Sequence, residues 1–134
     1  MATINNTRLV VSTEQSNNLV TLTVTCDVEF TDVEVNAMNL LGLQYTLQCQ
    51  IFDKDFWDRE PVAILDDWTL PDRLEASASH HEHVELTTDR PLTDLRTHYL
   101  GKDNLQAEVR LRNQETGQVE VSSRSDYLSV DLTA

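Results

Sequence analysis

Residues 19–31 read LVTLTVTCDVEFT, and this stretch decides the fold class. From Val20 to Phe30 every second residue is apolar, and the residues between them are threonines and acids. Successive side chains of a strand point to opposite faces, so the alternation predicts a strand with one apolar and one wet face. One wet face is typical of an antiparallel sheet, because parallel sheets are usually covered on both sides. The apolar row then needs a second layer to pack against.

The same two-residue period recurs at 43–51 and 105–111. Shorter strands are expected at 8–12, from residue 62, and at 80–87, 118–122 and 126–132. This spacing predicts an all-β fold, an antiparallel β-sandwich of seven or eight strands. Immunoglobulin-like, C2-like and jelly-roll topologies all fit, and periodicity does not choose among them.

The connections are less regular than the strands. In residues 32–42, Val33 and Val35 would extend the preceding strand after a bulge, and the chain would turn at 39–42. Pro91 and Gly101 frame a short helix near residues 91–100. Residues 1–6 are polar and are expected to be frayed. The 134 residues are expected to form one β-sandwich domain.

The chain is strongly acidic, with 23 Asp and Glu against 10 Lys and Arg and a net charge of −13. This balance argues against nucleic acid as a partner, and against an anionic membrane surface unless calcium bridges the two. No apolar run approaches the roughly 18 residues of a transmembrane helix. The start, MATINNTRLV, lacks the basic and apolar regions of a signal peptide. We therefore expect a soluble protein that is cytoplasmic, or exported without a cleaved signal peptide.

The two cysteines, Cys26 and Cys49, both lie on the apolar parity of their strands. Free cysteine is often buried, and without a secretory leader a disulfide is not expected. The pattern predicts two reduced thiols in the core.

Acidic residues gather in two predicted loops. If the strands alternate up and down, the loop at 53–60 lies at the same end of the sandwich as the segment 88–104. Calcium takes six to eight oxygen ligands, often from loop carboxylates, so this end is a candidate calcium site. Its ligands would come from Asp53, Asp55, Asp58, Glu60, Asp89, Asp94 and Asp103. The spacing is not that of an EF-hand, and a solvated acidic loop is the simpler interpretation.

Histidines and aromatic residues offer two further hypotheses. His81 and His83 would project from one strand face and could supply two zinc ligands, but a catalytic zinc needs a third. His98 lies in the long loop, and a carboxylate could serve instead, but no spacing points to one. An exposed polar face is the alternative. Phe56 and Trp57 lie in the acidic loop, where they would contact a ligand or partner, or else plug the end of the sandwich.

Motifs of catalysis are scarce. The chain has no G-x-S-x-G, H-E-x-x-H, P-loop or dinucleotide fingerprint, so an enzyme is not expected. The outward row of 105–112 carries Gln106, Glu108, Arg110 and Arg112, and that of 43–51 is glutamine and threonine. An uncharged polar face loses less hydration when it is covered than a charged face does.

These observations favour a non-catalytic interaction or structural module that acts through protein–protein contact or self-association, without a cofactor. One alternative is a calcium-dependent ligand-binding module, C2-like or carbohydrate-binding, that uses the acidic loops. A second is a metal-dependent hydrolase built on the histidine-rich strand.

Overall fold

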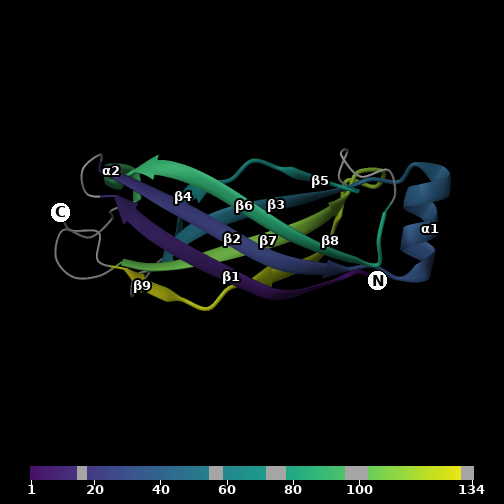
Figure 1. The fold of residues 1–134 in the computed structure, drawn as a ribbon, viewed down its shortest axis with the longest axis horizontal. Coiled ribbons are helices and arrows are strands. Elements are labelled where there is room, and N and C mark those ends of the chain that lie inside the picture. The colour runs from purple at the N-terminus through teal and green to yellow at the C-terminus, as the bar shows by residue number, and fades with distance from the viewer. Residues whose placement is uncertain (15–17, 55–58, 72–77, 96–102, 131–134) are drawn as a thin grey trace.

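A computed structural model of the protein describes residues 1–14, 18–54, 59–71, 78–95 and 103–130 (Figure 1). These residues form two antiparallel sheets packed face to face, which confirms the predicted all-β sandwich. Figure 1 shows the smaller sheet in front of the larger one, with helices at the two ends of the molecule.

The smaller sheet has three strands in the order β1-β2-β6. They are β1 (Thr3–Glu14), β2 (Leu19–Glu29) and β6 (His81–Pro91). The predicted anchoring strand is therefore the central one, β2, which has a neighbour on each side.

The larger sheet has the order β4-β3-β7-β8, with β5 added to β3 and β9 added to β7. Its members are β3 (Tyr45–Lys54), β4 (Arg59–Ile64), β5 (Trp68–Leu70), β7 (Asp103–Asn113), β8 (Val119–Arg124) and β9 (Leu128–Val130). The other two strongly alternating stretches thus pair with each other as β3 and β7, and they face β2 across the core.

The core follows the predicted alternation. Along β2, buried and partly exposed residues alternate from Leu19 to Val28. Val24 and Leu47, which come from opposite sheets, are 1% and 0% exposed and belong to one apolar cluster. Each such side chain contributes about 1.5–3 kcal/mol when it leaves water, so these rows supply most of the drive for the sheets to stack.

The first strand is longer than the sequence suggests. β1 begins at Thr3, inside the segment expected to be frayed, and Ile4 is buried opposite Val28 of β2. A register shift between Asn5 and Arg8 interrupts the pairing. This irregularity breaks the alternation that would otherwise mark the whole strand.

Residues 32–41 are a helix, α1 (Asp32–Leu41), not an extension of the strand. The Thr31 hydroxyl accepts a hydrogen bond from the Glu34 backbone N–H, and the Glu34 carboxylate accepts one from the Thr31 backbone N–H. This capping box satisfies two of the donors that a helix start leaves open. Gly42 ends the helix in the left-handed region at φ 72°. Val35 and Met38 are the buried residues of α1.

The predicted helix near residues 91–100 is short in the described chain. It is α2 (Leu92–Leu95), and β6 runs up to it as far as Pro91. Leu95 is fully buried, and Leu92 packs against the core. Residues 96–102 lie outside the described residues.

Candidate functional site

The two outward rows noted in the sequence lie side by side on the larger sheet. β3 pairs with β7 so that Gln48 is opposite Arg110 and Gln50 is opposite Glu108. Residues directly opposite each other in an antiparallel pair share a face. One continuous polar surface therefore crosses the middle of this sheet.

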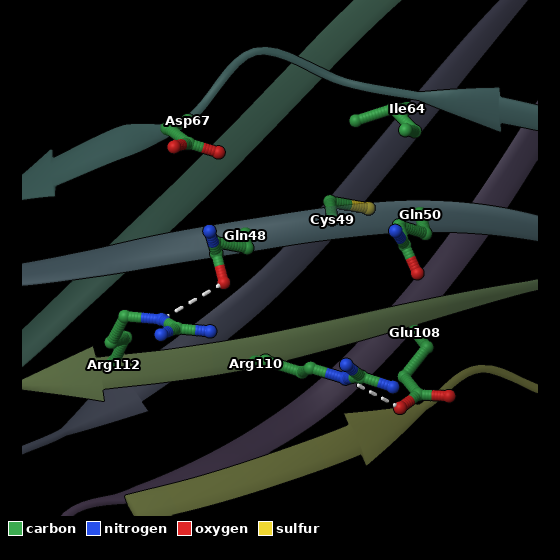
Figure 2. A pocket seen from close by; sticks show the side chains of 8 residues that line it. All are labelled: Gln48, Cys49, Gln50, Ile64, Asp67, Glu108, Arg110 and Arg112. Carbon is green, nitrogen blue, oxygen red and sulfur yellow. Dashed lines mark hydrogen bonds and ion pairs between the residues drawn. The ribbon is translucent and has the colours of Figure 1, made fainter. Parts of the chain in front are cut away.

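Glu108 contacts two arginines of this surface, and Figure 2 shows the contact with Arg110. Nε of Arg110 donates to Oε1 of Glu108 at 2.9 Å, and Nε of Arg124 lies 3.2 Å from Oε2. The Glu108 side chain is only 5% exposed, whereas those of Arg110 and Arg124 are 44% and 57% exposed. The carboxylate is thus covered while both guanidinium groups reach solvent.

Arg112 is held in the same way by neutral partners. Its Nε donates to the side-chain oxygen of Gln48 at 3.3 Å, and a terminal nitrogen donates to the carbonyl of Gly117 at 2.9 Å. We call Gln48, Gln50, Arg110, Arg112 and Arg124 the glutamine–arginine face.

A groove of about 250 Å³ runs over this face. Ile64, which is 60% exposed, and Asp67 line it from the β4–β5 side. The groove offers fixed guanidinium and amide donors beside one exposed aliphatic side chain. That mixture can hydrogen-bond a carbonyl or carboxylate and bury a small apolar group.

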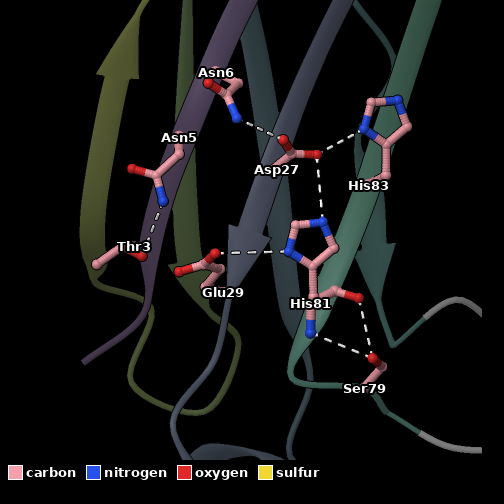
Figure 3. A network of polar contacts seen from close by, with 8 residues as sticks. All are labelled: Thr3, Asn5, Asn6, Asp27, Glu29, Ser79, His81 and His83. Atoms are coloured by element: carbon pink, nitrogen blue, oxygen red, sulfur yellow. Dashed lines mark hydrogen bonds and ion pairs between the residues drawn. The ribbon is translucent and has the colours of Figure 1, made fainter.

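The histidines lie on the outer face of the other sheet (Figure 3). Nδ1 of His83 lies 2.7 Å from Oδ1 of Asp27, and Nε2 of His81 lies 3.7 Å from the same oxygen. Nδ1 of His81 lies 3.7 Å from Oε1 of Glu29. Asn6 donates to the other Asp27 oxygen at 2.9 Å. Hydrogen bonds from Asn6 and His83, with the charge of His83 and His81, hold the pKa of Asp27 below its usual range.

His80 belongs to a different contact, with its Nε2 against Asp32 at the start of α1. Among the residues that the structure describes, no three His, Cys, Asp or Glu side chains are already arranged as the ligands of a metal ion. The predicted pair His81 and His83 therefore has carboxylate neighbours, with one hydrogen bond between His83 and Asp27 and longer polar contacts from His81 to Asp27 and Glu29.

The acidic end of the sandwich is described only in part. Asp53, near the end of β3, lies opposite Leu105 of β7, and Asp103 is two residues before Leu105 on the same strand. Asp53 and Asp103 are nearly fully buried, at 3% and 1% exposed. Asp89 is exposed and accepts a hydrogen bond from the Thr21 hydroxyl at 2.6 Å.

Of the other carboxylates, Asp55 and Asp58 lie outside the described residues, as do the side chains of Glu60 and Asp94. The calcium site therefore stays a prediction. If the site exists, the protein should melt at a higher temperature in millimolar calcium than in chelator, because a ligand that binds only the folded state stabilises that state.

Phe56 and Trp57 also lie outside the described residues, so their contact with a ligand or partner stays a prediction. Trp68, on β5, is partly buried against the core.

Both cysteines are free and buried, at 1% exposed each. Burial, with the nearby charge of Asp27, raises the pKa of the Cys26 thiol to about 12. Burial, and then the neighbouring Cys26, raises the pKa of the Cys49 thiol to about 12 as well. Neither thiol is poised as a nucleophile at neutral pH.

Comparisons with known proteins identify no family. No family model matches the sequence, and no curated protein matches it. Two solved structures show weak likeness. A Bordetella pertussis protein assigned as ApaA is 8% identical, with a TM-score of 0.37 over 97% of this chain and 92% of that one. The sporulation control protein Spo0M of Bacillus subtilis is 12% identical, with a TM-score of 0.34 over 99% of this chain and 49% of that one. Likeness at this level carries no argument about function.

Neither helix within the described residues is long and apolar enough to cross a membrane.

Proposed function

We propose that the protein is a non-catalytic interaction module, and that it acts through protein–protein contact at the glutamine–arginine face. The observation that carries this proposal is the pairing of β3 with β7, which joins an uncharged glutamine row to an arginine row on one surface. A partner protein or a second copy of the chain would cover the groove above it.

The cost of covering this face is small for a polar surface. Gln48 and Gln50 carry no charge, and the buried carboxylate of Glu108 already has Arg110 and Arg124 beside it. Hydration lost by neutral amides is recovered by new hydrogen bonds, whereas a lone buried charge would cost far more.

The arginines supply the attraction. Each guanidinium has five N–H donors, and Arg110 and Arg124 each approach Glu108 through Nε. Arginine is enriched among the residues that dominate binding energy at interfaces. Three of the chain's 10 basic residues lie on this face, against 23 acidic residues in the whole sequence. The favoured partner surface presents carboxylates or backbone carbonyls to them.

The proposal is tested by adding charge to the face without touching the core. The double variant Gln48→Glu/Gln50→Glu places two carboxylates on β3, and Thr23→Glu/Thr87→Glu places two on the outer face of the smaller sheet as a matched control. Affinity capture from the native source finds the partner, and sedimentation equilibrium reports any self-association.

We expect wild type and the threonine variant to bind alike and the glutamine variant to bind at least about tenfold more weakly, since like charges then oppose each other. Equal binding by both variants would overturn the proposal, as would a wild-type protein that captures nothing and sediments as a monomer at high concentration.

A further inference from the structure

The outer face of the smaller sheet brings together four side chains that could surround a cation. In the β2–β6 pairing, Asp27 lies opposite His83 and Glu29 lies opposite His81. All four therefore point to the same face, and Figure 3 shows Asp27 in contact with both rings and Glu29 in contact with that of His81. Asn6 reaches Asp27 from β1, at the register shift, where its φ is 56°.

The separations are close to those of neighbouring metal ligands. Two atoms bound to one tetrahedral zinc at about 2.1 Å lie roughly 3.4 Å apart. The distances from Asp27 Oδ1 to Nδ1 of His83 and to Nε2 of His81 are 2.7 Å and 3.7 Å, which bracket that value. A shift of under about 1 Å in each of these two pairs would bring Oδ1 to ligand spacing with both ring nitrogens, and both rings are exposed and can turn about it. Metal binding would replace the hydrogen bond that now joins His83 to Asp27.

We infer that this face binds a divalent transition-metal ion through Nε2 of His81, Nδ1 of His83 and Oδ1 of Asp27. The inference is independent of the proposed interaction function, which uses the other sheet. The two histidine side chains are 57% and 61% exposed, so a metal can enter from solvent and water completes its coordination. Two imidazoles with one carboxylate suit zinc, nickel or copper, whereas calcium and magnesium prefer oxygen ligands.

Two flanking groups are placed as outer supports of such a site. Histidine ligands usually donate their second ring nitrogen to a carboxylate, and Nδ1 of His81 already faces Glu29 at 3.7 Å. Asn6 occupies Oδ2 of Asp27, which leaves Oδ1 for the metal.

Zinc binding to untagged protein, measured by calorimetry, tests the inference. Wild type should take up one equivalent of Zn²⁺, and His81→Gln and His83→Gln should each weaken binding by at least tenfold. Asn6→Ala should weaken it by about tenfold, which is the low end for loss of an outer support. Cobalt added in place of zinc should give visible absorption bands that disappear in His83→Gln.

The matched controls are His80→Gln, whose ring contacts Asp32, and His98→Gln, which lies outside the described residues. Both should bind zinc as wild type does. Circular dichroism and melting without metal confirm that each variant is folded. The inference is overturned if wild type takes up no zinc, or if His81→Gln and His83→Gln bind zinc as tightly as wild type. It is also overturned if His80→Gln or His98→Gln causes the same loss.

Discussion

The hydroxyl of Tyr45 donates a hydrogen bond of 3.3 Å to Oε2 of Glu34, which ties the first residue of β3 to the first turn of α1. The same oxygen accepts from the backbone N–H of Ala2 at 3.1 Å, and the other carboxylate oxygen closes the capping box with Thr31. One carboxylate therefore joins the chain start, the helix and the larger sheet at this end of the sandwich.

Replacing Glu34 by Gln keeps the size of the side chain but removes its charge. Hydrogen bonds to a charged group are worth about 1.5–3 kcal/mol, so we expect the free energy of unfolding to fall by roughly 1–3 kcal/mol. Urea denaturation at pH 7 measures it. Glu115→Gln, at an exposed turn, is the control and should change the free energy of unfolding by less than about 0.5 kcal/mol. Equal stability of the two variants would contradict this role.

The contribution of Glu34 should depend on pH. Partial burial raises the pKa of its carboxyl, but hydrogen bonds from Thr31 and Ala2 and the charge of the chain start outweigh burial and hold this pKa below its usual value of 4.5. A carboxyl whose pKa is lowered by folding stabilises the protein at pH values above its pKa in the unfolded chain. This stabilisation is lost as the pH falls through its pKa in the folded protein. The stability difference between wild type and Glu34→Gln should be full above about pH 5 and shrink toward pH 3. A difference that stays constant over this range would show that the charge is not involved.

The core prediction compares two leucines. Leu47 is fully buried, so Leu47→Ala should lower the free energy of unfolding by about 2–5 kcal/mol. Leu41 is 84% exposed at the end of α1, so Leu41→Ala should change it by less than about 0.5 kcal/mol. Chemical denaturation of both proteins makes the comparison. Similar losses would mean that the two positions do not differ in burial in solution.

The main strands could be predicted from the sequence because the alternation of apolar and polar residues is a local signal. Along β2 and β3 it identifies both the strand and the side that is buried, whereas on β7 Gln106 and Glu108 of the predicted outward row are buried as well. It failed where a local rule competes with it: Val33 and Val35 resemble a continuing strand, yet Thr31 and Glu34 form a capping box. That T-x-x-E spacing was readable in the sequence and would have indicated the helix.

The candidate sites depend on pairing, which one sequence does not show. Asp27 and His83 are 56 residues apart, and only the register of β2 against β6 places them opposite each other. The sequence argument therefore could not say which carboxylate lies beside the histidines. By contrast, the glutamine and arginine rows were visible separately, and only their adjacency required the structure.

Gly42 provides a test of the end of α1. Its φ of 72° is strained for any residue with a Cβ, although no heavy atom lies within 4 Å of the place a Cβ would take. Gly42→Ala should therefore cost roughly 1–2 kcal/mol through backbone strain alone. Asn36→Ala, on the exposed side of the same helix, should be neutral or stabilising because alanine is the better helix former. A calorimetric melting temperature that falls in Asn36→Ala but not in Gly42→Ala would refute this account.

The cysteines provide a test of the sandwich interior. With a pKa of about 12, roughly one thiol in ten thousand is ionised at pH 8, and both sulfur-bearing residues are 1% exposed. Ellman's reagent should therefore react slowly with the native protein. In about 6 M guanidinium, which denatures the protein, it should react with two thiols per chain.

The matched control is Thr23→Cys, which adds a thiol on the outer face of β2. It should add one fast-reacting equivalent to the native protein, because an outward thiol is open to the reagent. Slow reaction of Cys26 and Cys49 beside a fast engineered thiol separates burial from any general loss of reactivity. Fast, stoichiometric reaction of native wild type would mean that the two sheets do not close over these residues.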